Sequence, residues 1–308
     1  MINGIINIHK EAGFTSHDVV AKMRGICGQK KIGHTGTLDP QATGVLPVCL
    51  GSATKLCDML TDKDKEYVAE LLLGVTTDTQ DTTGQILSEM DITEFFREFF
   101  QEEFLVEKIR ETVLGFAGEY DQIPPMYSAL KVNGKKLYEL AREGKEVERR
   151  ARKVMIHEIE ILSIELPVVK MRVSCSKGTY IRTLCADIGE RLGTGGTMQS
   201  LVRTRVSDFV LQDAITLTGL QKLKDEGRLE EAVIPVDRVF SYCPALHVKE
   251  KYRILLDNGN SFYPDQTLEG IVHETGVRVR VYREDQSFAG VYAYEEGQKR
   301  YKPVKMFL

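Results

Sequence analysis

Short stretches in which apolar and polar residues alternate recur along the chain, and a few longer segments repeat apolar residues at helical spacing. The alternating pattern predicts strands at residues 2–8, 66–73, 156–164, 168–176 and within 198–211. The apolar run 45–50 fits a short strand or the start of a helix. Helical spacing predicts helices after an N-cap at Ser16, over about 94–114 and over about 180–192. The segments 28–44 and 76–84, rich in Gly or in Thr and Asp, are expected to be mostly loop.

The pattern changes near residues 235–244, which Pro235 and Pro244 mark. Beyond this stretch, short runs of alternating apolar residues are separated by turns, at 277–283, 288–294 and 301–307. Short strands of this kind predict a small β-barrel. We therefore expect two domains, residues 1–240 and 241–308.

Length and composition are those of a soluble globular protein. The chain has 308 residues, of which 42% are hydrophobic and 28% charged. No stretch of about 18 apolar residues predicts a transmembrane helix, and the first residues lack the basic and apolar blocks of a signal peptide. The sequence therefore predicts a cytoplasmic protein without a membrane partner.

The cysteines predict neither disulfides nor a metal site. All 6 lie within apolar runs and none forms a C-x-x-C pair. We expect buried, reduced thiols of a cytosolic protein. No group of Cys and His residues has the spacing of metal ligands, so no metal is expected.

Charge is segregated along a chain whose net charge is −4. Residues 91–120 contain eight acidic and three basic side chains, whereas residues 127–153 contain nine basic and four acidic ones, together with Tyr127 and Tyr138. A local basic patch can bind phosphates even on an acidic protein. The charge pattern alone leaves two alternatives open for 127–153, a solvated helical face or a surface for nucleic acid.

Two motifs suggest chemistry that their spacing does not support. Ser16, His17 and Asp18 have the residue types of a hydrolase triad, but neighbours on a helix point about 100° apart and cannot converge. The glycine-rich stretch 193–196 follows a predicted helix and lacks the Lys-Ser/Thr of a phosphate-binding loop. Capping and turn formation explain both motifs better.

The segment 33–47 places His34 and Asp39 five residues apart in a loop rich in special backbone positions. Pro40 favours an extended conformation at Asp39, and the glycines permit tight turns. A structural aspartate in a turn and a catalytic carboxylate are both compatible with the residues themselves.

The full segment 33–47 resembles the signature of the TruB family of tRNA pseudouridine synthases. Further blocks resemble the family's motifs in the family's order, at 65–67, 73–74, 124–142, 175–184 and 201–205. One departure is Glu11 after Lys10, where the family usually has proline. The last sixty residues are similar in pattern to a PUA domain, a small RNA-binding barrel.

The resemblance implies an α+β fold, with a large mixed sheet and flanking helices in a pseudouridine-synthase core, plus a small C-terminal PUA-like β-barrel. It implies isomerisation of uridine 55 in the tRNA T-loop to pseudouridine. That reaction exchanges a bond from C1′ to N1 for one from C1′ to C5, so no cofactor is expected.

The resemblance also assigns residues. Asp39 is expected to be the catalytic carboxylate, Arg182 its partner, and Tyr67 a residue that stacks on the base and helps remove the C5 proton. Substrate contacts are expected from His34, Tyr180, Leu201 and Lys10. An RNA-binding insertion is expected at about 120–153, with contacts from Tyr127, Lys131, Lys135, Lys136 and Arg142.

Two alternatives remain beside a stand-alone enzyme. One is a catalytically silent protein that binds or folds RNA, against which the intact Asp39, Tyr67 and Arg182 argue. The other is the guide-RNA-dependent relative of archaea and eukaryotes, which usually has extra segments and often a Lys-rich tail. We therefore expect a monomeric enzyme that acts on the tRNA T-arm without guide RNA.

Overall fold

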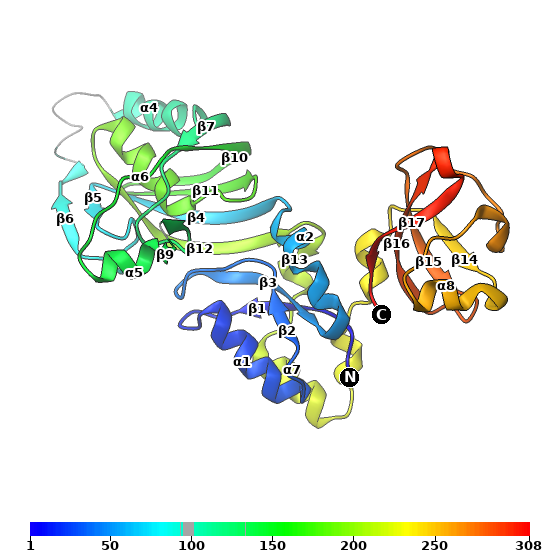
Figure 1. Cartoon of the computed structure of the whole chain (residues 1–308). Helices are drawn as coiled ribbons and strands as arrows, with labels where there is room; N and C mark the ends of the chain where they lie inside the picture. The colour runs from blue at the N-terminus through cyan, green and yellow to red at the C-terminus, as the bar shows by residue number, and fades with distance from the viewer. Residues whose placement is uncertain (93, 95–101, 133) are drawn as a thin grey trace.

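The computed structural model describes residues 1–92, 94, 102–132 and 134–308. Within these residues, nine strands form one mixed sheet (Figure 1). Its main path runs in the order β1 (Gly4–Lys10), β3 (Thr43–Leu50), β12 (Gly196–Val206), β4 (Lys65–Leu73), β11 (Val168–Cys175), β10 (Arg152–Glu165) and β7 (Gly118–Gln122). β2 (Ile32–His34) pairs with β3, and β13 (Phe209–Val210) pairs with β12.

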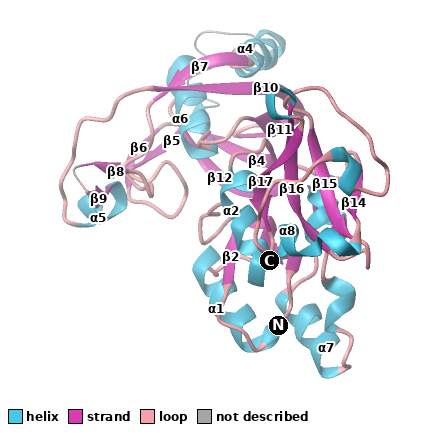
Figure 2. Ribbon diagram, turned by 45° about the vertical axis from the view of Figure 1, so that its right-hand side comes forward, coloured by secondary structure: helices cyan, strands magenta, loops and turns pink. Residues whose placement is uncertain are grey.

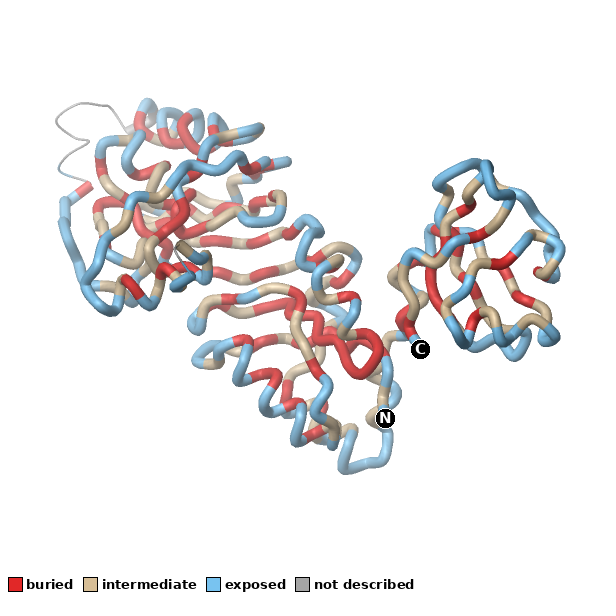
Figure 3. Tube along the Cα trace, viewed as in Figure 1, coloured by how far each residue is buried: buried red, intermediate tan, exposed pale blue. Residues whose placement is uncertain are grey.

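The burial pattern explains why these segments are strands. In β4 and β11 every second residue is buried, as expected for a sheet with one face against a core. β3 is buried at nearly every position, because both of its faces are covered (Figure 3). The strands predicted at 2–8, 66–73, 156–164, 168–176 and within 198–211 are confirmed, and 45–50 is a strand.

Helices cover the sheet in two groups. α1 (Ser16–Cys27) and α7 (Leu217–Asp225) pack on β1 and β3, around Met23, Leu46 and Leu220. α4 (Glu102–Leu114) and α6 (Ile181–Leu192) pack on the β4, β11 and β10 part, around Ile109, Met171 and Ile188 (Figure 2). The helix expected at 94–114 is thus present from Glu102; residues 95–101 lie outside the described part.

The N-cap of α1 is Thr15, not Ser16 as predicted. Thr15 Oγ1 accepts from the amide of Asp18, whose carboxylate accepts from the amide of Thr15 in return. Ser16 is the first helical residue, and its buried hydroxyl contacts Leu38 instead. Both residues have capping chemistry, so the tertiary contact of Ser16 decides between them.

Strands β3 and β12 form the one parallel pairing of the described sheet, through Thr43 with Val202 and Gly44 with Arg203. Gly44 has a φ of +108°, and a Cβ there would lie 2.2 Å from the Arg203 carbonyl oxygen. Only glycine lets the two backbones approach this closely. The loop between β2 and β3 ends at this junction.

Two small hairpins and a short helix lie outside the main sheet. β5 (Val75–Thr77) pairs with β6 (Ile86–Glu89), and β8 (Lys131–Val132) pairs with β9 (Lys135–Lys136). α5 (Leu137–Arg142) follows β9 directly. The basic insertion is therefore the excursion between β7 and β10, and it projects to one side of the sheet with β8, β9 and α5 (Figure 2).

The C-terminal region forms a four-stranded sheet in the order β14 (Ala245–Val248), β15 (Arg278–Arg283), β16 (Phe288–Glu295) and β17 (Arg300–Met306). β14 and β17 are its edges, so the predicted barrel does not close. The segment between β14 and β15 holds α8 (Arg253–Asp257) and reaches the edge strands through single bridges only, at Thr267 and Phe262. The edge strands β14 and β17 are therefore not joined by a hydrogen-bonded ladder.

This region packs on the main sheet domain through an apolar cluster. Val291 and Phe307 join Phe240 of η4 (Val236–Phe240) in the core that also covers β3. Lys55 of η1 (Gly51–Leu56) donates to the Met306 carbonyl at 2.9 Å. The boundary proposed near residue 240 thus lies inside a packed junction.

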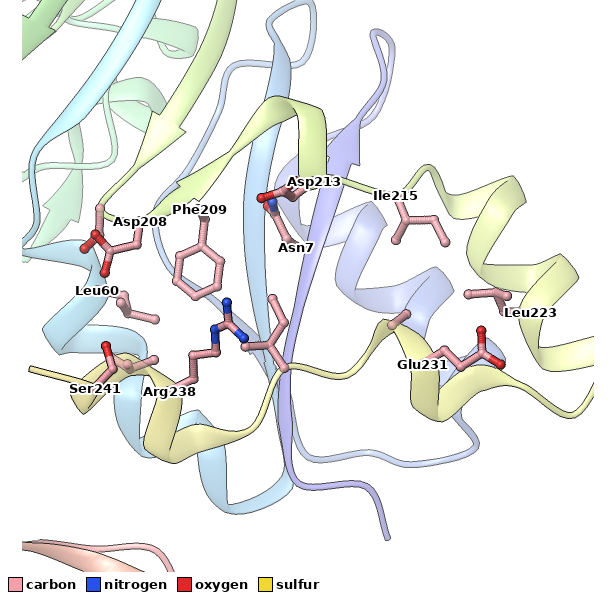
Figure 4. A pocket seen from close by; sticks show the side chains of 14 residues that line it. Asn7, Leu60, Asp208, Phe209, Asp213, Ile215, Leu223, Glu231, Arg238 and Ser241 are labelled. Atoms are coloured by element: carbon pink, nitrogen blue, oxygen red, sulfur yellow. The ribbon is translucent and has the colours of Figure 1, made fainter. Parts of the chain in front are cut away.

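A pocket of about 660 Å³ lies between β13, α2 (Cys57–Thr61) and the segment 231–241 (Figure 4). None of the predicted site residues lines it. No helix in the described part of the chain has the length and apolar content needed to cross a membrane. The cysteines are free thiols; Cys27 and Cys57 are only partly buried, unlike the other four.

The close approach at Gly44 leads to a stability prediction. Gly44→Ala should destabilise the protein by about 3–5 kcal/mol, because positive φ costs about 1–2 kcal/mol and the overlap adds a packing cost. Gly28→Ala is the matched control, since Gly28 has a φ of +63° and a Cβ would meet nothing within 4 Å. Thermal unfolding should show a fall in Tm several times larger for Gly44→Ala, and equal falls would contradict this account.

Candidate active site

Two charged side chains from distant parts of the chain meet near the β3–β12 junction. Asp39 lies in the loop between β2 and β3, and Arg182 lies in the first turn of α6. Arg182 Nε is 2.9 Å from Asp39 Oδ2, and Arg182 Nη2 donates to Asp39 Oδ1 at 3.2 Å. Two guanidinium nitrogens therefore hold both carboxylate oxygens, which fixes the orientation of the carboxylate.

The remaining donors of Arg182 bind two further segments. Nη1 donates to the Thr79 carbonyl at 3.0 Å, and Nη2 also donates to the Tyr127 carbonyl at 2.9 Å. Asp81 Oδ2 lies 3.8 Å from Nε. Arg182 thus joins the Asp39 loop to the loop 76–84 and to the basic insertion.

The Asp39 carboxylate can still be reached by a ligand. Its side chain keeps 36% of its surface exposed, against 6% for Arg182. Burial raises the pKa of Asp39; the Arg182 guanidinium opposes this effect, and the Asp81 carboxylate adds to it. The site therefore presents an oriented carboxylate that is more basic than a free aspartate, suited to act as a nucleophile or a base.

Two buried side chains hold the backbone on either side of Asp39. Ser16 Oγ accepts from the amide of Leu38 at 3.0 Å. Lys10 Nζ donates to the carbonyl of Pro40 at 3.0 Å. The residues before and after the carboxylate are therefore both fixed from β1 and α1.

Lys10 departs from the predicted role in substrate binding. Its side chain is fully buried, so the ammonium faces the loop backbone and offers no surface to a nucleotide. Burial lowers the pKa of Lys10 to about 8, which leaves it charged at neutral pH. Its contacts make it an internal support of the loop.

Arg203 of β12 is not among the predicted site residues, yet it supports the same loop. Its side chain is 1% exposed. Nε donates to the Val45 carbonyl at 2.7 Å, Nη2 donates to the Gly36 carbonyl at 3.3 Å, and Arg203 lies opposite Tyr67 in the pairing of β12 with β4. The sequence offers no signal that separates Arg203 from Arg205 in the same strand; its burial identifies it, because a buried arginine needs partners for its donors.

Tyr67 of β4 lies beside the carboxylate loop. It is 8% exposed and packs in the same apolar cluster as Leu38 and Leu201. Burial raises the pKa of Tyr67 to about 12, so its phenol is neutral at physiological pH. The structure therefore pairs Arg182 with Asp39 and places Tyr67 in the apolar cluster that includes Leu38, the residue before Asp39, and Leu201.

His34 and Tyr180 lie at the margin of this group. The His34 ring stands edge-on to His17, with centroids 5.3 Å apart, and its Nδ1 accepts from the amide of Gly36 at 3.3 Å. Burial lowers the pKa of His34, which favours the neutral imidazole. Tyr180 is the N-cap residue of α6 and is partly buried.

Two family models cover most of the chain. The model of the TruB family pseudouridylate synthase N-terminal domain matches residues 24–181, and that of the tRNA pseudouridylate synthase B C-terminal domain matches residues 182–241. This chain belongs to the TruB family. As a TruB member it is a pseudouridine synthase, an isomerase.

Relatives of the TruB chain agree with this assignment. A tRNA pseudouridine synthase B of Lachnoclostridium phytofermentans is 51% identical, with 100% of both chains covered. That of Alkaliphilus oremlandii is 47% identical, covering 100% of this chain and 99% of the relative. A chain in a solved Cbf5–Nop10–Gar1 complex is similar with a TM-score of 0.71 and 28% identity, covering 99% of this chain and 85% of that one. One in an H/ACA ribonucleoprotein bound to substrate RNA has a TM-score of 0.70 and 26% identity over the same shares.

The TruB insertion presents its predicted cations at the surface, but not all are free. Lys131 and Arg142 are exposed, whereas Lys135 lies 3.5 Å from Glu143 and Lys136 Nζ lies 5.3 Å from the Tyr138 ring centroid. Among the described residues of the insertion, Tyr127 contacts the Asp39–Arg182 pair, through its backbone carbonyl. The insertion is thus connected to the site by main chain.

Asp81 is a second residue near the site that the sequence did not single out. It accepts from the hydroxyls of Thr79 and Thr83, which shape its loop. The Thr- and Asp-rich composition of 76–84 predicted a loop, but many surface loops share it. Only the 3.8 Å approach to Arg182 separates Asp81 from the other loop acids.

Arg182→Lys should reduce the rate of uridine isomerisation by about 100-fold or more. Lysine keeps the charge but cannot hold both carboxylate oxygens and two carbonyls in one plane. Single-turnover rates at saturating enzyme measure the effect. The control is Arg172→Lys, an arginine paired with Glu160 at the surface, which should stay within about twofold. A wild-type rate for Arg182→Lys would show that the two-point contact of the guanidinium with Asp39 is not needed for the reaction.

Proposed function

We propose that this TruB-family enzyme isomerises uridine 55 in the T-loop of tRNA to pseudouridine, without a cofactor. The observation that carries the proposal is the Asp39 carboxylate, which Arg182 holds in one orientation while 36% of its surface stays exposed. Relatives named tRNA pseudouridine synthase B, up to 51% identical over their whole length, support tRNA as the substrate.

The isomerisation of uridine requires a carboxylate and a group that accepts the C5 proton. The C1′–N1 bond breaks, a C1′–C5 bond forms, C5 loses a proton and N1 gains one, so no electrons are exchanged with another molecule. Asp39 either attacks the sugar or base, or removes the C2′ proton. Both routes need an ionised and oriented carboxylate. The Arg182 guanidinium favours the ionised form and fixes its orientation.

Tyr67 is assigned to stack on the uracil and to help move the C5 proton. The phenolate is the form that could accept this proton, and with a pKa of about 12 little phenolate is present at neutral pH. The positive charge of Arg203 favours the phenolate and so opposes the effect of burial on the pKa of Tyr67. Leu201 and Tyr180 complete the uridine pocket in this assignment.

The target base must leave the folded T-arm to reach Asp39, at a cost of a few kcal/mol. The exposed cations Lys131 and Arg142 of the insertion, with Lys135 and Lys136, supply phosphate contacts that offset this cost. His34, neutral and partly buried, is assigned to occupy the space that the base vacates.

The C-terminal residues 241–308 are proposed to be a PUA-like RNA-binding domain. Its edge strand β17 carries Lys302 and Lys305, and also Arg300, which pairs with Glu295. Lysines on one strand are suited to contact a phosphate backbone. The catalytic domain in this proposal is residues 1–240.

The enzyme is proposed to act as a cytoplasmic monomer without guide RNA. Its identity to the tRNA pseudouridine synthase B relatives, 51% and 47%, exceeds its 26% identity to the chain in the H/ACA ribonucleoprotein. A role in tRNA folding is compatible with this activity.

Mapping pseudouridine in a tRNA transcript with purified enzyme alone tests the function. The wild type should convert uridine 55, whereas Asp39→Asn should abolish turnover and keep tRNA affinity within about tenfold, because phosphate contacts elsewhere supply most of the affinity. Asp62→Asn, an exposed carboxylate paired with Lys177, is the control and should be fully active. Turnover by Asp39→Asn above a few per cent of wild type would contradict the role of Asp39.

The insertion is tested by the salt dependence of binding. Replacing Lys135 and Lys136 together by Ala should weaken tRNA binding and flatten the log–log slope of Kd against salt by about one to two units. We expect the lower end, because Glu143 already neutralises part of the Lys135 charge. Single-turnover rates at saturating enzyme should fall much less than affinity.

The control removes the same charge from α7, as Lys222→Ala with Lys224→Ala. Both lysines are in the last turn of that helix. The helix packs against α1, and it lies far from the insertion in Figure 1. An unchanged slope in the Lys135/Lys136 variant would mean that the charges of the insertion are only solvated and do not contact phosphates.

A further inference from the structure

Gln122 is a buried amide at the root of the basic insertion. It ends β7 and is 1% exposed. Its side chain binds both backbone groups of one residue: the Tyr180 amide donates to Oε1 at 2.8 Å, and Nε2 donates to the Tyr180 carbonyl at 3.0 Å. Two hydrogen bonds to one residue fix its orientation as well as its position.

Tyr180 is the N-cap of α6, and its side chain makes no capping hydrogen bond. The contact with Gln122 therefore holds the start of the helix in place of a side-chain cap. Arg182 follows two residues later, in the first turn. A shift of the N-cap would move the guanidinium relative to Asp39, because the helix backbone is rigid over this distance.

A further chain of hydrogen bonds keeps Gln122 in this rotamer. Nε2 also donates to the Tyr120 hydroxyl oxygen at 2.5 Å, and that hydroxyl donates to Asp187 Oδ2 at 3.1 Å. Asp187 lies in α6, so the chain returns to the same helix one turn after Arg182. Both ends of the Gln122 amide are occupied, and rotation would leave buried polar groups without partners.

The same stretch of chain contacts the catalytic pair from a second point. Five residues after Gln122, the Tyr127 carbonyl accepts from Arg182 Nη2 at 2.9 Å. The first residues of the insertion thus hold Arg182 from both the helix backbone and the guanidinium. These two contacts connect the start of the insertion with Arg182.

We propose that Gln122 is a positioning residue of this enzyme: through Tyr180 it sets the first turn of α6, so that Arg182 meets Asp39, and it links this placement to the root of the RNA-gripping insertion. The proposal rests on the roles proposed above for Asp39 and Arg182. Gln122 touches neither substrate nor the reacting atoms.

Gln122→Met tests the proposal, since methionine has a similar shape but neither donates nor accepts at these atoms. The single-turnover rate at saturating enzyme should fall by about 10- to 100-fold, whereas Kd for tRNA should stay within about threefold. Asn7→Leu is the matched control: Asn7 is a buried amide whose Nδ2 donates to the Val210 carbonyl at 2.8 Å, outside the site. It should lower Tm comparably and leave the rate unchanged.

Tyr120→Phe serves as a milder second variant should Gln122→Met fail to fold. It removes one contact of the Gln122 amide and should reduce the single-turnover rate by about threefold with Kd unchanged. A folded Gln122→Met enzyme with the wild-type rate, or equal rate losses in Gln122→Met and Asn7→Leu, would overturn the inference alone. A wild-type enzyme that makes no pseudouridine would overturn the proposed function as well.

Discussion

A buried arginine must find an acceptor for each of its donors, and this requirement organises the structure around Arg182. Its guanidinium binds the Asp39 carboxylate, the Thr79 carbonyl and the Tyr127 carbonyl. These acceptors come from three loops that are far apart in the sequence. Leaving a donor of a buried group without a partner is costly, so the three loops are held in one arrangement.

The loop of Asp39 is supported by cations rather than by apolar packing alone. Lys10 and Arg203 are both buried, and both donate to backbone carbonyls of that loop instead of to a carboxylate. The Lys10 charge lies close to Asp39 and, with the Arg182 guanidinium, partly compensates for the burial of Asp39. A carboxylate in such a place can remain ionised and reactive while its backbone stays fixed.

An acidic chain that acts on RNA needs its positive charge to be concentrated. The excursion between β7 and β10 provides this concentration, on two short strands and a helix outside the main sheet. Gln122, at the end of β7, contacts Tyr180, and Tyr127, near the start of the excursion, contacts Arg182. The basic excursion and the placement of Arg182 therefore depend on one stretch of chain.

Local physics made much of this protein readable from its residues. Alternation identified β4 and β11, because one face of each strand is buried, and helical spacing identified α6. The resemblance of 33–47 pointed to Asp39, and the later motifs to Tyr67 and Arg182, which the fold brings together. The alternating C-terminal segments are strands, but whether the sheet closes depends on pairing between its edges, which alternation within a strand does not encode.

Tertiary structure decided what depends on contacts between distant segments. Thr15 rather than Ser16 caps α1 because Ser16 binds Leu38, and Lys10 faces the loop interior because Pro40 offers it a carbonyl. Asp81, Arg203 and Gln122 carry no local signal of their roles, since each acts through a partner far away in the chain. The sequence by itself predicted most of the long strands, the helices α1, α4 and α6 and the pairing of Asp39 with Arg182. Only the fold decided which other polar groups hold this pair, because a buried polar group is defined by the partner that satisfies it.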